Sequence, residues 1–109
     1  MHTSSGMQVC IDHCLRCYRI CLDMASSHCL ELGREHTKPA HIRLMLACSE
    51  VCRSAAHLML LGTPHHRDLC AKCAEICEDC ARDCERVGNM EECVKACRAC
   101  AESCRKMAA

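Results

Sequence analysis

Three stretches of this 109-residue chain carry cysteine at alternating steps of four and three residues. Each follows the pattern CxxxCxxCxxxC, at 10–21, 73–84 and 93–104, and a CxxxC pair lies at 48–52. An α-helix makes one turn every 3.6 residues, so these steps return to one face, the a/d seam of a helical bundle. The spacing therefore predicts helices whose inward faces are lined with sulfur.

Glycine, proline and capping residues divide the chain into four such helices. Three glycines suit the left-handed position that follows a helix end: Gly33, Gly62 and Gly88. Thr37 and Pro39 can open the next segment as cap and first-turn proline, and Asn89 with Glu92 can form a capping box. The sequence predicts helices at 7–32, 38–61, 64–87 and 89–107.

Short loops between these helices make sequential neighbours antiparallel. We therefore expect an all-α fold, an up-down-up-down four-helix bundle with a cysteine-lined core. The whole chain, residues 1–109, is expected to be a single metal-binding domain in which residues 1–6 are disordered.

Every cysteine except Cys29 falls on the predicted seam, as do several methionines and histidines. The seam cysteines are Cys10, Cys14, Cys17, Cys21, Cys48, Cys52, Cys70, Cys73, Cys77, Cys80, Cys84, Cys93, Cys97, Cys100 and Cys104. Met24 and His28 continue the seam of the first helix, and Met45 and His41 that of the second. Cys29 lies one residue beyond His28, and two interpretations stay open for it, ligand and bystander.

The short loops also align the seam positions of the four helices in levels. The predicted levels, from the middle of the bundle toward the 33–37 loop, are Cys17, Cys52, Cys73 and Cys104; Cys21, Cys48, Cys77 and Cys100; Met24, Met45, Cys80 and Cys97; and His28, His41, Cys84 and Cys93. Because methionine and histidine are also metal ligands, we expect the end near the 33–37 loop to be the entrance for metal.

The composition agrees with a sulfur core and excludes several classes of protein. The chain has 16 Cys but no Trp or Phe, whereas ordinary cores are built from Leu, Ile, Val and Phe. Fourteen basic and fourteen acidic residues cancel, and neither a basic patch nor stacking aromatics indicate nucleic acid. The N-terminus MHTSSGMQVC does not resemble a secretory signal, and no apolar run approaches the roughly 20 residues that cross a membrane. We expect a cytosolic protein with reduced thiols.

Reduced thiols on one helix face indicate metal binding rather than disulfides. Thiols four residues apart on a helix have Cβ atoms about 5–6 Å apart, wider than the roughly 3.5–4.5 Å of a disulfide. Soft sulfur ligands select Cu(I), Zn(II) or iron–sulfur clusters. One Cu(I) per thiolate leaves a nearly neutral core, whereas each Zn(Cys)₄ unit would keep two negative charges without an inward cation. The iron–sulfur spacing that ends in C-P is not matched, because no proline follows the cysteines.

The chain resembles the bacterial copper storage proteins, which are cysteine-rich four-helix bundles. The resemblance is carried by the cysteine runs at 10–21, 73–84 and 93–104 and the pair at 48–52, and it covers nearly the whole chain. It implies multiple Cu(I) ions held largely by CxxxC thiolate pairs, a homotetramer, and histidine and methionine near one end that assist entry. Without an export signal, the chain looks like the cytosolic branch. The expected ligands are all sixteen cysteines, Cys29 included, with Met45, His28 and His41.

The helix at 38–61 departs from the family pattern, since it has only two cysteines. Its layers are expected either to hold less copper or to use Met45 and His41 instead. Four histidines off the seam are expected to be solvated: His13, His36, His57 and His65.

Alternative functions stay open beside copper storage. The runner-up is a zinc or general thiol buffer of metal or redox state, and a third interpretation is a structural helical scaffold. No nucleophile–base pair or carboxylate constellation indicates an enzyme. The helices at 7–32 and 38–61 carry apolar residues off the seam, such as Leu15 and Leu46, which predicts self-association through these two helices. The donor and the acceptor of copper are not identified.

Overall fold

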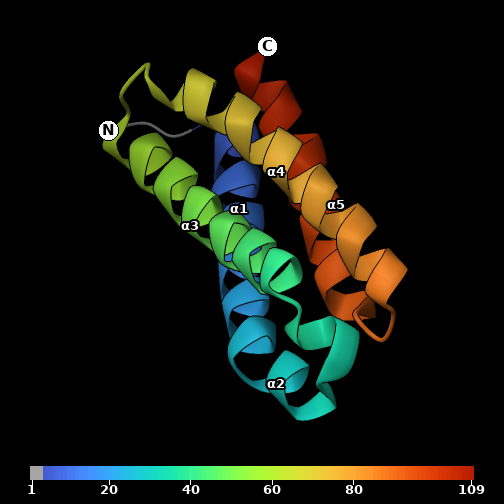
Figure 1. Ribbon diagram of the computed structural model, residues 1–109. Helices are drawn as coiled ribbons and strands as arrows, with labels where there is room; N and C mark the ends of the chain where they lie inside the picture. The colour runs from blue at the N-terminus through green and yellow to red at the C-terminus, as the bar shows by residue number, and fades with distance from the viewer. Residues whose placement is uncertain (1–3) are drawn as a thin grey trace.

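The computed structural model of the protein describes residues 4–109, which form a helical bundle of 45 × 20 × 19 Å (Figure 1). Its elements are α1 (Ser5–Asp23), the π-helical segment η1 (Met24–His28), α2 (Cys29–Leu32), the 3₁₀ segment η2 (Arg34–Thr37), α3 (Pro39–Leu61), α4 (His66–Val87) and α5 (Glu91–Ala108). α1, η1 and α2 follow one another without a break and together occupy the first predicted helix. No strand occurs between residues 4 and 109.

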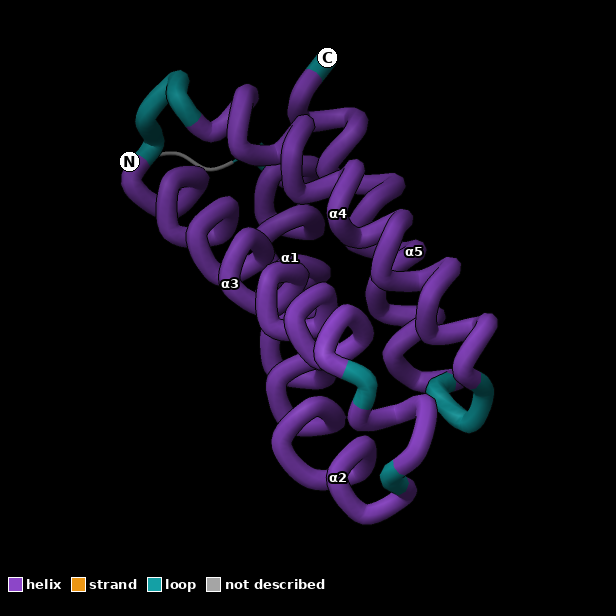
Figure 2. The backbone as a smooth tube through the Cα atoms, viewed as in Figure 1, coloured by secondary structure: helices purple, strands orange, loops and turns teal. Residues whose placement is uncertain are grey.

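The four long helices enclose one core. α1 packs against α3 and α5, and α4 packs against the same two helices from the other side. Short loops join them, and α2 with η2 closes the end of the bundle at which α4 turns into α5 (Figure 2). The predicted fold class, an antiparallel four-helix bundle, is confirmed.

The helix boundaries agree with the sequence, but two of the predicted caps are wrong. α3 begins after Lys38, and the Thr37 hydroxyl donates instead to the Arg34 carbonyl at 3.0 Å, which closes η2. α5 begins after Met90 without a side-chain cap, because Asn89 takes a left-handed conformation (φ 57°) within the α4–α5 turn. The difference at Thr37 arises because a short side chain in a tight turn can bond to a local carbonyl instead of a helix end.

The N-terminus is ordered earlier than expected. The Ser4 hydroxyl accepts a hydrogen bond from the Met7 amide at 3.1 Å and caps α1, so Ser5 and Gly6 are helical. The prediction of disorder for residues 1–6 is therefore wrong for residues 5 and 6, and residues 1–3 lie outside the described part of the chain.

The π-helical segment η1 shifts the seam of the first helix by one residue. A π-turn holds one more residue than an α-turn, so Ala25 and Cys29 face the core where Met24 and His28 were expected. Ser26 and Ser27 support the wider turn, because their hydroxyls donate to the carbonyls of Leu22 at 2.8 Å and Asp23 at 2.6 Å. The predicted seam places of Met24 and His28 are thus corrected, and Cys29 joins the core.

α3 is apolar on two sides. By length and composition alone it is apolar enough to cross a membrane, with a mean hydropathy of 1.4 over an 18-residue window of which 44% is buried in the bundle. The expectation that no segment approaches that length is therefore wrong for α3. The reason is that one face of the helix carries Cys48 and Cys52 into the core, while Leu46 and Leu60 stay exposed on the outside.

Candidate metal centre

All sixteen cysteines are free thiols with no exposed surface. Fourteen of them form one continuous column of sulfur between the four helices, with neighbouring Sγ atoms 3.3–4.0 Å apart. Cys70 extends the column within 4.8 Å of Cys10 and Cys104, and Cys29 joins it through the Met45 sulfur at 3.7 Å. Small residues lie beside the thiols on α4 and α5 and let these two helices approach closely: Ala74, Ala81, Ala96 and Ala101. The predicted sulfur-lined core is therefore present, and Cys29 belongs to it.

Fourteen of the sixteen thiols, all except Cys29 and Cys84, fall into groups whose sulfur atoms all lie within 4.8 Å of one another. From the N-terminus of α1 toward α2, the groups are Cys10, Cys70 and Cys104; Cys14, Cys73, Cys100 and Cys104; Cys17, Cys52, Cys77 and Cys100; Cys17, Cys21, Cys48 and Cys97; and Cys21, Cys80, Cys93 and Cys97. Each group shares at least one cysteine with the next. The column therefore has no boundaries that would divide it into separate sites.

The predicted levels are correct for the cysteines of sequential helices, but wrong for Met24 and His28, which η1 turns off the seam, and for the pair α1 and α5. The sulfur atoms of Cys52 and Cys73 lie 3.7 Å apart, as expected when a short loop joins α3 to α4. Cys17, however, was placed level with Cys104, and its sulfur instead lies 3.7 Å from that of Cys97. No loop connects α1 to α5, so their relative level is set only when the bundle closes.

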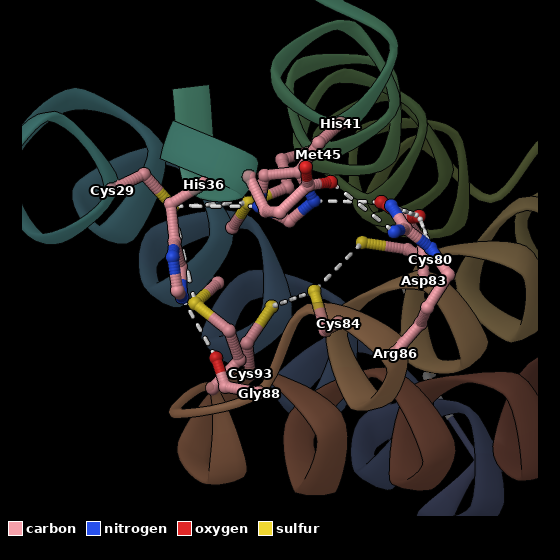
Figure 3. Close-up of polar contacts among 12 residues, drawn as sticks. Cys29, His36, His41, Met45, Cys80, Asp83, Cys84, Arg86, Gly88 and Cys93 are labelled. Atoms are coloured by element: carbon pink, nitrogen blue, oxygen red, sulfur yellow. Dashed lines mark hydrogen bonds and ion pairs between the residues drawn. The ribbon is translucent and has the colours of Figure 1, made fainter. Parts of the chain in front are cut away.

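A mixed group of ligands follows the thiols at the end closed by α2 (Figure 3). The Cys29 sulfur lies 3.5 Å from Nε2 of His41, 3.7 Å from Sδ of Met45 and 3.9 Å from Sδ of Met90. His41, Met45 and Met90 are almost completely buried. Of the predicted ligands at this end, the structure brings together Cys29, His41 and Met45, and it leaves out His28.

Two histidines connect this end of the bundle to the turn between α4 and α5 by hydrogen bonds. Nε2 of His28 lies 2.8 Å from the Asn89 carbonyl, and Nε2 of His36 lies 2.8 Å from the Gly88 carbonyl, so each ring donates to the α4–α5 turn. His36 was expected to be solvated, but it is only 8% exposed and lies edge-on to His41 (Figure 3). Its burial was missed because η2 folds back over the core, which helical periodicity does not describe.

The remaining off-seam histidines agree better with the sequence. His57 and His65 are exposed, as predicted. His13 is half-buried and its Nδ1 lies 3.1 Å from the Ser103 hydroxyl, so it contacts α5 rather than facing solvent.

The column contains no positive charge of its own. All fourteen Lys and Arg side chains are exposed, so a thiolate in the core has no cation of the protein beside it. Burial raises the pKa of the Cys29 thiol, and the neighbouring Cys93 and Cys80 add to the effect. Hydrogen bonds led by that of Cys21 lower the pKa of Cys93 to about 6, so the thiols do not titrate alike. A column of buried thiolates with no cation around it suits the binding of metal cations.

Comparison with known proteins identifies the family. The family model described as copper storage protein matches residues 3–109 of this chain. The chain belongs to the copper storage protein family. The resemblance inferred from the cysteine runs and the predicted storage function are thereby confirmed.

Relatives of this copper storage protein share both sequence and fold. The structure of the Nmul_A1745 protein from Nitrosospira multiformis is 51% identical, with a TM-score of 0.93 over 94% of both chains. The Cu(I)-bound copper storage protein BsCsp3 is 36% identical, with a TM-score of 0.88 over 96% of this chain and all of the other. The uncharacterized cysteine-rich protein YhjQ of Bacillus subtilis (strain 168) is 36% identical over 77 residues, 71% of this chain and 70% of the relative.

Proposed function

We propose that this protein stores or sequesters several Cu(I) ions in its thiol column and has no catalytic activity. The observation that carries the proposal is the overlap of the thiol groups, since neighbouring groups share cysteines along the whole column. Thiolate is the ligand that Cu(I) prefers, and bridging thiolates let many ions share one set of sulfurs. The Cu(I)-bound relative with the same fold and all of its length matched supports the choice of metal.

The sharing of cysteines between groups also favours copper over zinc, which is the alternative metal. A four-thiol group suits tetrahedral zinc, and a separate structural zinc site uses four ligands for one ion. Cys17, Cys21, Cys97 and Cys100 each belong to two of the four-thiol groups, so at most two such groups can be filled at once. Zinc would therefore leave half of the four-thiol groups unused, while Cu(I) can use all of them.

Charge favours Cu(I) for the same column. A buried unpaired ion costs several kcal/mol, and all of the basic side chains are exposed. One Cu(I) per thiolate removes this cost, because each ion brings the single positive charge that replaces the proton of the thiol. Two negative charges would remain on each zinc–tetrathiolate unit.

The end closed by α2 is our candidate for the entrance. A pocket of about 400 Å³ opens there and is lined by Cys84, Met90 and the turn residues Gly88 and Asn89. Behind it lie Cys29, His41 and Met45, whose thiolate, imidazole and thioether groups are ligand types that suit copper. Copper that arrives at Met90 would meet the Cys29 thiol, which lies 3.9 Å from the Met90 sulfur.

We further propose that the protein acts in the cytoplasm as a homo-oligomer, a tetramer as in the resemblance, joined through α1 and α3. The large hydrophobic side chains that are exposed all lie on α1, α2 or α3: Val9, Leu15, Leu22, Leu30, Leu32, Leu46, Leu60 and Leu61. Within the described chain, no large hydrophobic side chain is exposed on α4 or α5. The outer faces of these two helices are charged. A second copy of the same surface is the occupant that covers this face without leaving charge unpaired.

Anaerobic metal titration tests the storage function. We expect the reduced protein to retain far more than about four Cu(I) per chain against a competing chelator, and to bind Zn(II) only in the small number that separate four-thiol groups allow. Saturation at about four or fewer ions with Zn(II) preferred would overturn the proposal. A thiol count of sixteen on the metal-free protein verifies that no disulfide has removed ligands.

A further inference from the structure

The carboxylate of Asp83 on α4 lies between a buried histidine and an exposed arginine (Figure 3). Its Oδ2 is 2.6 Å from Nδ1 of His41, and its Oδ1 accepts hydrogen bonds from Arg86 at 2.8 and 3.2 Å. The His41 side chain has no exposed surface, whereas that of Asp83 is 20% exposed. Asp83 is neither a thiol nor a predicted ligand, so the storage function alone does not account for it.

These contacts fix which nitrogen of His41 carries the proton. The guanidinium of Arg86 donates two hydrogen bonds to Oδ1 of Asp83 and forms an ion pair with it, which is the geometry of an ionised carboxylate. An ionised carboxylate only accepts hydrogen bonds, so Nδ1 of His41 must be the donor. In a neutral imidazole the other nitrogen then holds a lone pair. That nitrogen, Nε2, lies 3.5 Å from the Cys29 sulfur.

We propose that Asp83 is a positioning residue that holds His41 as an Nε2 ligand and so creates a separate copper site of mixed nitrogen and sulfur ligands. The site consists of Cys29, His41, Met45 and Met90. The inference rests on the proposed function, because it takes Cu(I) as the cargo. It differs from the thiol groups in that one thiolate alone neutralises one Cu(I), while the imidazole and the thioethers add no charge.

The distances suit one small ion. Metal bonds to histidine nitrogen and cysteine sulfur are roughly 2.0 and 2.3 Å long, as zinc sites show. When the angle at the metal is near tetrahedral, the nitrogen and sulfur of two such ligands lie about 3.5 Å apart. Nε2 of His41 and the Cys29 sulfur have this separation, 3.5 Å. The thioether sulfurs of Met45 and Met90 lie 3.7 and 3.9 Å from the Cys29 sulfur, so they can complete the coordination of the same ion. Carboxylates that orient metal-bound histidines in this way raise metal affinity about 10–100-fold.

The variant that tests the role of Asp83 is Asp83→Asn, and Arg86 determines how its new amide group is oriented. In Asp83→Asn the new amide must turn its oxygen toward Arg86, which offers only donors, and its NH₂ group toward His41. Nδ1 of His41 then accepts a hydrogen bond, so the proton moves to Nε2 and blocks the ligand lone pair. Asp79→Asn is the matched control, because Asp79 pairs with Arg82 three residues later on the same helix but lies exposed.

The first measurement is the tautomer of His41 in the copper-free full-length chain, read by long-range ¹H–¹⁵N correlation at neutral pH. We expect protonated Nδ1 in the natural protein and in Asp79→Asn, and protonated Nε2 in Asp83→Asn; His41→Gln assigns the signal. Protonated Nε2 in the natural protein overturns the proposal, whether or not Asp83→Asn folds. So does an unchanged tautomer in a folded Asp83→Asn variant.

The second measurement is Cu(I) retained against a graded chelator. We expect Asp83→Asn to lose about one Cu(I) per chain at a chelator strength where Asp79→Asn keeps it, a change of about 10–100-fold in affinity at that site. Equal retention in the two variants overturns the assignment. Failure of the proposed function looks different, since the natural protein would then retain few Cu(I) ions while the tautomer result remains as expected.

Discussion

The sulfur atoms of Cys21 and Cys93 lie 3.3 Å apart across the contact between α1 and α5, the shortest separation between two thiols in the described chain. Cys21 belongs to two of the four-thiol groups, whereas Cys70 belongs to one group of three at the far end of the column. The thiols are therefore not equivalent as ligands, although all are equally buried.

Replacing Cys21 by Ser should lower Cu(I) capacity more than replacing Cys70 by Ser. One substitution removes a ligand shared by two groups, and the other removes a ligand from a single group. Each buried hydroxyl is expected to cost the metal-free protein about 1–3 kcal/mol, so thermal unfolding serves as the check that both variants are folded. Equal losses of copper in an anaerobic chelator competition would contradict the shared role of Cys21.

Deleting Ser26 should turn the π-helical segment into a continuous α-helix and leave Cys29 in the core. The deletion places Cys29 seven residues after Cys21, which is two turns of an α-helix and the same face. Deleting Ser26 and Ser27 together should instead rotate Cys29 by about 100° and expose it. The rate at which Cys29 reacts with a thiol reagent under native conditions distinguishes the two. Rapid reaction in the single deletion would contradict the structural account of the π-segment.

Leu46→Glu should dissociate the proposed oligomer. Leu46 is 42% exposed on α3, and a carboxylate there would be buried without a partner against a second copy. The control is Ala71→Glu, since Ala71 is exposed on α4, away from the apolar face. Light scattering should report a smaller mass for Leu46→Glu alone. A monomeric natural protein would contradict the interface, and the copper titration would be unaffected by that result.

Copper uptake should release protons and weaken at low pH. Because burial raises the pKa of Cys29, this thiol is protonated at neutral pH, and Cu(I) must displace its proton. Falling pH adds protons that compete for the thiolate, so affinity at such a thiol should drop about tenfold per pH unit. A titration in weak buffer with a pH indicator should show about one proton fewer released by Cys29→Ser. Uptake without proton release would mean that the column is already ionised.

Much of the column could be predicted from the sequence. Steps of four and three residues decide which face of each helix carries the thiols, because the backbone hydrogen bonds of a helix fix its period locally. The same local rules place the helix ends near Gly33, Gly62 and Gly88. Short loops then decide the level of sequential helices, as the contact between Cys52 and Cys73 shows.

The rest depends on contacts between segments that are distant in the chain. The level of Cys21 against Cys93 is set when α5 closes the bundle, and no local pattern encodes it. The place of Cys29 depends on one extra residue in η1, which a fixed helical period cannot reveal. In the sequence, Asp83 is one of several charged residues predicted for the outer face of α4. Only the packing of α3 against α4 places His41 beside it. The sequence thus determined what each helix offers to the core, and the tertiary structure decided which of those groups meet.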